Sequence, residues 1–292
     1  MKHFVWVSLW LLLFLPATGW AKVQVVVSIV PQKYFVEKIA GNLAEVTVMV
    51  PPGASPATYE PRPSQMRALS RADLYLAIGV PFEKAWLPRF AAQNPKMKIV
   101  DITEGIRKVP MVDHNHDHDH DHGQEGRHPH ETLDPHVWLA PPLVKILARN
   151  IAQALERIDP AHKGRYAANL EAFLKEIEAT DRTLRRILQP CRGAAMMVFH
   201  PSWGYFARTY GLEQIPIEIE GKEPRPKELA RLMAEAKEAG IRAIFVQPQF
   251  SRRAAEVIAG NIGARVVVAD PMALAWSENL LQVARRLCRI AR

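Results

Sequence analysis

The chain has 292 residues, of which 48% are hydrophobic and 23% are charged, a balance typical of a folded globular protein. This composition excludes a chain that is disordered throughout or built from collagen-like repeats. Lys and Arg exceed Asp and Glu, which gives a net charge of +8. Because the basic residues are spread along the predicted helices, we expect no nucleic-acid partner.

The first 21 residues are typical of a secretory signal peptide. Lys2 and His3 precede an apolar run from Phe4 to Leu15, and the segment ends at Ala21. The run is shorter than the roughly 20 residues that a membrane-spanning helix needs, and no Cys follows it to carry a lipid anchor. We therefore expect the mature protein to be exported and soluble.

Strands and helices alternate through the first half of the mature chain. Short β-branched or apolar runs predict strands at residues 23–30, 45–50, 74–78 and 98–101. Helices are predicted between them, at residues 31–40, 63–72 and 81–92. This βαβ alternation predicts a parallel sheet, and we place the N-terminal α/β lobe at residues 22–141.

A long helical segment follows the first lobe, at residues 142–189. Residues 143–158 carry apolar side chains at helical spacing, and Asp159 and Pro160 provide a helix start that nothing interrupts until Pro190. A helix from 160 to 189 would be on the order of 45 Å long at 1.5 Å per residue. We therefore expect a rigid spine that joins two lobes.

The second half repeats the alternation and predicts a C-terminal α/β lobe at residues 190–292. Strands are predicted at residues 194–199, 214–219, 243–246 and 265–268, and helices at 202–210, 226–239, 251–261 and 277–290. The predicted fold class is therefore two (β/α) lobes with parallel sheets. Two cysteines, Cys191 and Cys288, are candidates for a disulfide in an oxidising compartment, but the sequence leaves their pairing open.

Histidines are concentrated between the first lobe and the spine. Seven of the 11 lie within 17 residues, and aspartates separate several of them: His114, His116, His118, His120, His122, His128 and His130. Neutral imidazoles suit zinc, copper and nickel, so we expect this His-rich segment, residues 113–130, to capture metal ions weakly. The alternative is a solvated linker without a binding role.

Three further residues are candidates for a single metal site. His136 lies in the turn that closes the irregular part of the first lobe, His200 directly follows a predicted strand, and Asp270 follows another. Ligands of open α/β sheets bind at the carboxyl ends of strands, so these side chains are expected to meet in a cleft between lobes. Alone, each has an ordinary structural explanation as a turn or satisfied polar residue; together they favour a metal site.

The sequence resembles the solute-binding proteins of ABC importers for zinc and manganese (the ZnuA and TroA-like family), most closely the zinc members. The resemblance covers essentially the whole mature chain. It is carried by an ordered series of motifs: PPGASP at 51–56, YEPRPS at 59–64, DPHVWL at 134–139, FHPSWGYF at 199–206, EGKEP at 220–224 and Asp270 with Pro271. The resemblance implies a periplasmic, non-enzymatic receptor that binds one metal ion between its lobes and delivers it to a membrane permease.

The family's metal ligands match His136, His200 and Asp270, but the fourth does not match. Where the family usually has a histidine, this chain has Ala57, which cannot bind a metal. A zinc ion that prefers four donors would take the last from water, from Glu60, or from a histidine of the His-rich segment. We expect zinc as the bound ion and a monomeric protein.

Two other interpretations stay open. Manganese or iron would occupy the same receptor site, although such ions want more oxygen donors than the sequence offers. A secreted zinc metalloenzyme would also keep two histidines, a carboxylate and an open position, but the sequence lacks a recognisable general-base motif.

Overall fold

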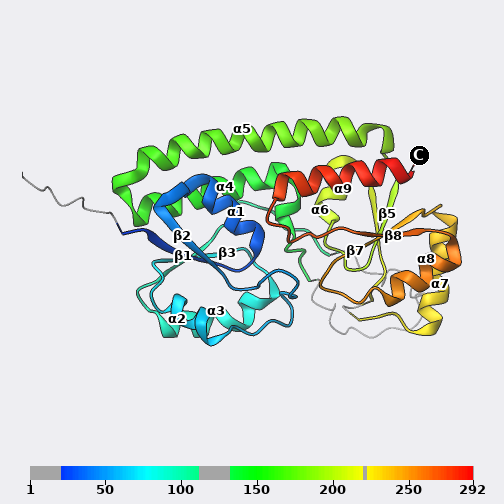
Figure 1. Ribbon diagram of the computed structural model, residues 1–292, viewed down its shortest axis with the longest axis horizontal. Coiled ribbons are helices and arrows are strands. Elements are labelled where there is room, and N and C mark those ends of the chain that lie inside the picture. The colour runs from blue at the N-terminus through cyan, green and yellow to red at the C-terminus, as the bar shows by residue number, and fades with distance from the viewer. Residues whose placement is uncertain (1–20, 112–131, 220–221, 292) are drawn as a thin grey trace, which may run out of the picture.

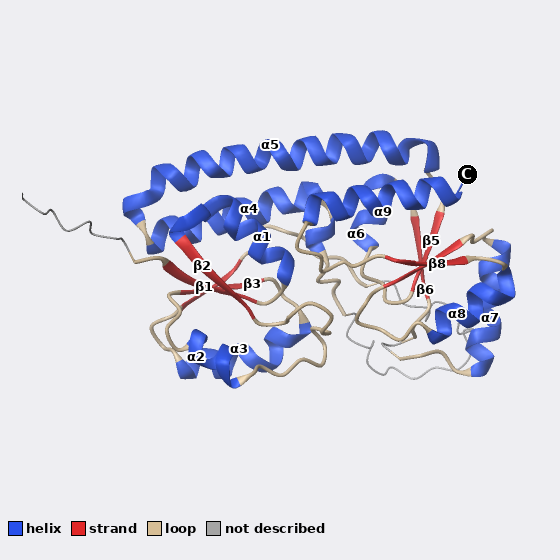
Figure 2. Cartoon of the chain, in the orientation of Figure 1, coloured by secondary structure: helices blue, strands red, loops and turns tan. Residues whose placement is uncertain are grey.

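The computed structural model describes residues 21–111, 132–219 and 222–291 and contains two parallel sheets covered by helices on both faces (Figures 1 and 2). The His-rich segment and all but the last residue of the predicted signal peptide lie outside the described residues. Within the described ranges, no helix has the length and apolar character needed to cross a membrane.

The N-terminal lobe is built on a four-stranded parallel sheet with the order β2-β1-β3-β4. Its elements are β1 (Val23–Val27), α1 (Val30–Ala40), β2 (Ala44–Val48), α2 (Pro63–Leu69), β3 (Leu74–Ala77), α3 (Pro81–Gln93) and β4 (Lys98–Asp101). Strand β1 is central, with Val27 level with Val48 of β2 and Leu76 of β3. Short 3-10 turns at Gly41–Leu43 and Val137–Leu139 complete the lobe.

The C-terminal lobe repeats this sheet in the order β6-β5-β7-β8, again with all strands parallel. Its elements are β5 (Ala195–Val198), α6 (Gly204–Tyr210), β6 (Glu213–Pro216), α7 (Pro226–Glu238), β7 (Ala243–Val246), α8 (Arg253–Ile262), β8 (Arg265–Val268) and α9 (Trp276–Ala291). The prediction of two parallel-sheet α/β lobes is therefore confirmed.

One layer of helices spans both lobes and holds them together. Helices α4 (Pro141–Ile158) and α5 (Lys163–Leu188) lie above the N-terminal sheet, and α5 continues beside α9 above the C-terminal sheet (Figure 1). A hydrophobic core runs under this layer through both lobes, while a second core lies between the C-terminal sheet and helices α7 and α8. Because the larger core is shared, the two lobes are packed as one body on this side.

The predicted spine is present but begins later than expected. Residues Pro160–His162 form a 3-10 turn, and the α-helix α5 has 26 residues. The turn forms because the carbonyl oxygen of Asp159 accepts the N–H of His162, and its carboxylate accepts the Tyr166 hydroxyl. At 1.5 Å per residue α5 is about 39 Å long, still the length of a whole lobe.

Several predicted boundaries shift by a few residues. The strand predicted at 23–30 ends at Val27, because the Gln32 side-chain oxygen accepts the N–H groups of Ser28 and Ile29 and turns the chain into α1. The predicted strand at 214–219 becomes Glu213–Pro216. Near the C-terminus, Cys191 and Cys288 are joined by a disulfide that ties the turn after α5 to α9.

Candidate metal centre

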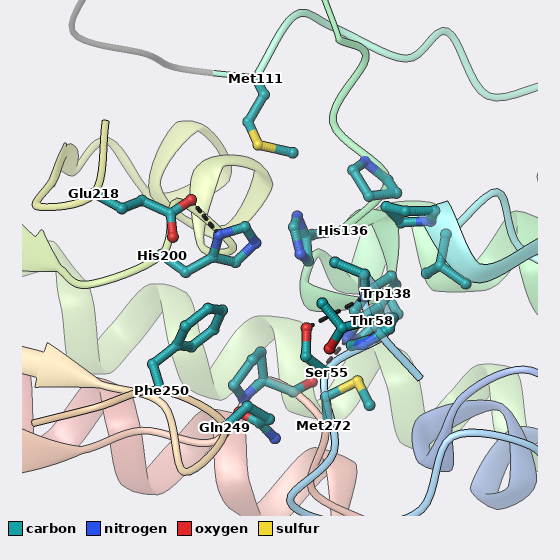
Figure 3. A pocket seen from close by; sticks show the side chains of 16 residues that line it. Ser55, Thr58, Met111, His136, Trp138, His200, Glu218, Gln249, Phe250 and Met272 are labelled. Atoms are coloured by element: carbon teal, nitrogen blue, oxygen red, sulfur yellow. Dashed lines mark hydrogen bonds and ion pairs between the residues drawn. The ribbon is translucent and has the colours of Figure 1, made fainter. Parts of the chain in front are cut away.

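A cavity of about 200 Å³ lies between the two lobes, beside the carboxyl ends of the C-terminal strands. Most of its lining is apolar, and its polar side chains are few (Figure 3). The N-terminal lobe contributes residues 55–58 and His136, and the C-terminal lobe contributes His200 and Glu218. The cleft predicted between the lobes is thus the place where the two histidines meet.

His136 is held in place by a single carboxylate. Its backbone N–H and its ring Nδ1 both lie within hydrogen-bond distance of Asp134 Oδ1, at 2.9 and 2.7 Å. A carboxylate accepts, so the Nδ1 carries the proton and the Nε2 is left as a donor for a metal. Burial lowers the pKa of His136, and the nearby Asp134 only partly opposes this effect. The imidazole is therefore kept neutral, as a metal ligand must be.

His200 has the same arrangement in the other lobe. It follows β5, and its Nδ1 lies 2.6 Å from Oε1 of Glu218, which is 5% exposed at the end of β6. The ring of Phe250 stacks against the imidazole, with centroids 5.2 Å apart. The buried Gln247 fixes the backbone of His200 by accepting its N–H and donating to its carbonyl oxygen.

The two imidazoles face each other across the cleft, with ring centroids 5.2 Å apart and planes at 70° (Figure 3). Since each Nδ1 is hydrogen-bonded to a carboxylate, each Nε2 is free to bind an ion. A carboxylate behind a ligating histidine fixes the ring's tautomer and orientation and raises its basicity. The pair therefore has the tautomers and the charge state that metal ligation requires.

Asp270 and Glu60 do not join this pair in the structure. Asp270 Oδ1 accepts the N–H of Met272 at 2.9 Å and the side-chain amide of Gln249 at 3.2 Å. Pro271 and Met272 line the cavity, whereas neither Asp270 nor the exposed Glu60 is among its described lining residues. Ala57 lines the cavity, so the position of the missing histidine is at the site.

The structure thus brings together two of the predicted ligands. Within residues 21–111, 132–219 and 222–291, no three His, Cys, Asp or Glu side chains form a group able to hold a metal ion. The cavity wall also contains a hydrogen-bond acceptor without a donor: Oε1 of Gln249 is buried and has no hydrogen-bond partner among the described residues. A metal-bound water molecule would provide the donor that this oxygen lacks.

Sequence reasoning missed the two carboxylates that orient the histidines. Asp134 stands two residues before His136 in an Asp-Pro-His turn, and short-range hydrogen bonding of aspartate to the backbone two residues on is a recognisable signal. Glu218 gives no such signal, because it lies 18 residues from His200 and meets it only through the pairing of β5 with β6.

Comparisons with known proteins agree with this fold and identify its family. A family model described as zinc-uptake complex component A, periplasmic (ZnuA), matches residues 25–286. The high-affinity zinc uptake system protein ZnuA of Bacillus subtilis (strain 168) is 28% identical over 256 residues, which cover 86% of this chain and 79% of that protein.

Two solved structures are similar over nearly the whole chain. A crystal structure of ZnuA is 43% identical, with a TM-score of 0.84, and the match covers 93% of this chain and 100% of that one. The structure of a ZnuA deletion mutant with zinc bound is 44% identical, with a TM-score of 0.83, and the match covers 92% and 98% of the two chains.

Proposed function

Because the chain belongs to the family of periplasmic zinc-uptake components, we propose that it captures one zinc ion between its lobes and delivers it to an ABC permease. The observation that carries this proposal is the facing pair of His136 and His200, each with Nδ1 held by a buried carboxylate. Two neutral imidazoles in a mostly apolar cleft suit zinc better than manganese, which prefers oxygen ligands.

The zinc ion would be bound by Nε2 of His136 and Nε2 of His200. Asp270 supplies the third donor in this proposal, because both of its hydrogen bonds fall on Oδ1 and no described donor is bonded to Oδ2. Binding through Oδ2 requires the Asp270 side chain to turn into the cleft. A water molecule that donates to Gln249 Oε1 would take the fourth position, the one that Ala57 leaves without a ligand.

The His-rich segment would act as an accessory zinc collector. Its seven histidines suit weak and multiple binding of zinc. The residues that flank it are close to the cleft, since Met111 lines the cavity and its N–H donates to the carbonyl oxygen of Thr132 at 2.9 Å. The segment therefore leaves and rejoins the fold at the edge of the metal site, where it can pass zinc to the two histidines.

Release to the permease would use small shifts of loops rather than a wide hinge motion. Helix α5 is bound to the N-terminal lobe through the Tyr34 and Lys38 contacts with Glu176, and to the C-terminal lobe through Thr180 and Ser277. Because one helix is anchored to both lobes, a large rotation would break contacts on both. The loops around residues 55–58 and 248–250 line the cleft and take no part in these helix contacts, so we propose that they are the parts that shift.

Zinc titration calorimetry with metal analysis tests the proposal, on the mature protein and on a version lacking residues 113–130. We expect one tight site in both proteins, with further weak binding only where the His-rich segment is present. His136→Ala should remove the tight site, whereas His162→Ala, outside the cleft, should leave it intact. If the mature protein binds no zinc tightly, the proposal is wrong; if only the deletion loses the tight site, the segment supplies a ligand.

A further inference from the structure

The cleft contains sulfur donors that the zinc site does not use. Met111 and Met272 both line it, and Met111 extends from the edge of the cavity toward the two imidazoles (Figure 3). Met272 is 4% exposed and packs in the shared hydrophobic core, whereas Met111 is half-buried and is not a member of either described core. The packing of the lobes therefore accounts for the Met272 side chain, whereas the Met111 side chain lines the cavity outside both described cores.

The carboxylates near the cleft are already engaged. Asp134 and Glu218 are bonded to the Nδ1 atoms of the two histidines, and Asp270 accepts two hydrogen bonds through Oδ1. In the conformation that the structure shows, the carboxylate that lines the cavity, that of Glu218, is bonded to His200. The other donors of the lining are neutral: the two imidazoles, the Gln249 side-chain oxygen, the hydroxyls of Ser55 and Thr58, and the thioethers of Met111 and Met272. A doubly charged ion loses most from a site without a carboxylate, and a singly charged ion loses least.

Imidazole and thioether ligands favour soft ions. Thioethers select Cu(I), a weakly hydrated ion that is satisfied by few donors, whereas zinc usually takes four. The surroundings of the pair are largely apolar, because Phe250 stacks on His200 and the ring of Trp138 lies 5.1 Å from that of His136. Ala57, which also lines the cavity, carries no donor that would compete with the Met111 side chain.

We propose that this cleft also binds one cuprous ion, through Nε2 of His136, Nε2 of His200 and the thioether sulfur of Met111. The inference rests on the proposed function in one respect, namely that the two histidines are the metal ligands of the cleft. It goes beyond that function because it assigns a new ligand and a second class of ion. Zinc binding through Asp270 and copper binding through Met111 would then be two arrangements of one site.

Sulfur provides a direct signature of this site. Cys191 and Cys288 are bonded to each other, so neither offers a thiolate. Residues 112–131 contain many histidines but no methionine or cysteine, so copper bound there would have only nitrogen and oxygen neighbours. Because Met111 directly precedes these residues, the copper–sulfur distance is measured on protein lacking residues 113–130, where it reports on the cleft.

The test compares the full mature protein with two isosteric variants, Met111→Leu and the matched control Met272→Leu. Cu(I) is supplied under argon as its bicinchoninate complex, at less than one equivalent of protein, and zinc affinity is measured separately by calorimetry. We expect Met111→Leu to weaken Cu(I) binding by about 10-fold or more and to change zinc affinity by less than about threefold, as expected for loss of one soft ligand. Met272→Leu should change neither.

X-ray absorption at the copper edge decides between the remaining outcomes. In protein lacking residues 113–130, copper should show one sulfur neighbour that Met111→Leu loses. If Cu(I) affinity and the sulfur signal are the same in Met111→Leu, or if the wild-type protein binds zinc but no Cu(I) at the cleft, the copper proposal is wrong and the zinc proposal stands. If His136→Ala alters neither zinc nor Cu(I) binding, the site itself is wrong and both proposals fail.

Discussion

The two lobes have the same sheet topology, but the carboxyl ends of their first strands, β1 and β5, have different surroundings. In each sheet the first strand is one of the two inner strands, and a buried glutamine holds the loop that follows it. Gln32, on α1, holds the loop after β1, and Gln247, directly after β7, holds the loop after β5. After β5 the loop presents His200 to the cleft. After β1 the matching loop presents Ser28, which is fully buried.

In the N-terminal lobe this strand end is closed by a network of polar groups. The Ser28 hydroxyl is hydrogen-bonded to the carboxylate of Glu83 and to the hydroxyl of Tyr75, and Glu83 also accepts the N–H groups of Ile78 and Gly79 at 2.8 and 2.7 Å. The strand end is therefore structural. The lobe supplies its ligand, His136, from the irregular chain before α4 instead.

This arrangement explains why His136 depends on the other lobe. The hydroxyl of Tyr205, on α6, accepts the N–H of Val109 and donates to the carbonyl oxygen of Asp134, both at 3.1 Å. The indole of Trp138 donates to the carbonyl oxygen of Pro271 at 2.7 Å. One ligand is positioned by a sheet and the other by contacts between lobes, so the shared topology alone does not determine where a metal site forms.

The difference between the lobes with the largest expected effect on stability is a disulfide. The C-terminal lobe carries the disulfide, and the N-terminal lobe has no cysteine. Replacing both Cys191 and Cys288 by Ala should lower the free energy of unfolding by about 4 to 5 kcal/mol, because the bond closes a loop with a sequence separation of 97 residues. Guanidinium unfolding with a chelator present measures this, and the reduced wild-type protein is the control. Equal midpoints for the oxidised wild type and the variant would contradict it.

The matching strand ends give the second prediction. His200→Ala should weaken zinc binding on the order of 100-fold, because the variant loses the binding free energy that one zinc ligand contributes. Ser28→Ala, in the loop that follows β1, should leave zinc affinity unchanged. It should lower the free energy of unfolding by about 1 to 3 kcal/mol, because Glu83 and Tyr75 lose a buried partner. Calorimetry and urea unfolding of the two variants measure both effects. Weaker zinc binding by Ser28→Ala would contradict the assignment of a purely structural role to the end of β1.

A third prediction concerns the carboxylate behind His200. Glu218→Gln should weaken zinc binding by about 10- to 100-fold, because an amide orients and polarises the imidazole less well than a carboxylate. Glu213→Gln, which alters an exposed residue of β6, the strand that precedes Glu218, is the control and should bind zinc as the wild type does. Equal zinc affinity in both variants would show that Glu218 does not act on the ligand.

The sequence predicted the framework of the site better than its details. Alternating apolar runs and helical stretches placed His200 at a strand end and His136 in a turn, because strand and helix periodicity is local information. The direction of Asp270 was not predictable, since it depends on hydrogen bonds to Gln249 and Met272 that form only when the loops pack. The role of Glu218 was missed for the same reason, because strand pairing brings it to His200.

The smallest predicted effect is the pH dependence of stability that Glu83 gives the polar network at the end of β1. Burial raises the pKa of Glu83 above its ordinary value of 4.5, and hydrogen bonds from Ser28, Ile78 and Gly79 only partly offset this. The folded protein therefore binds this proton more tightly than the unfolded chain does. The stability contributed by Glu83 is fully present below pH 4.5 and is lost as the pH rises through its pKa in the folded protein.

Glu83→Gln isolates this contribution, because glutamine does not titrate. The variant should be less stable at every pH, since its amide group meets a backbone N–H with a donor rather than an acceptor. The stability advantage of the wild type should shrink as the pH rises from 5 to 8, by at most about 1.4 kcal/mol per pH unit. Urea unfolding with a chelator, at matched ionic strength, measures the difference at each pH. If the wild type's stability advantage over Glu83→Gln stays constant or grows with pH, the Glu83 carboxylate is charged in the folded protein at no cost in stability. The polar network that closes the end of β1 would then hold a charge, unlike the neutral Gln247 network behind His200.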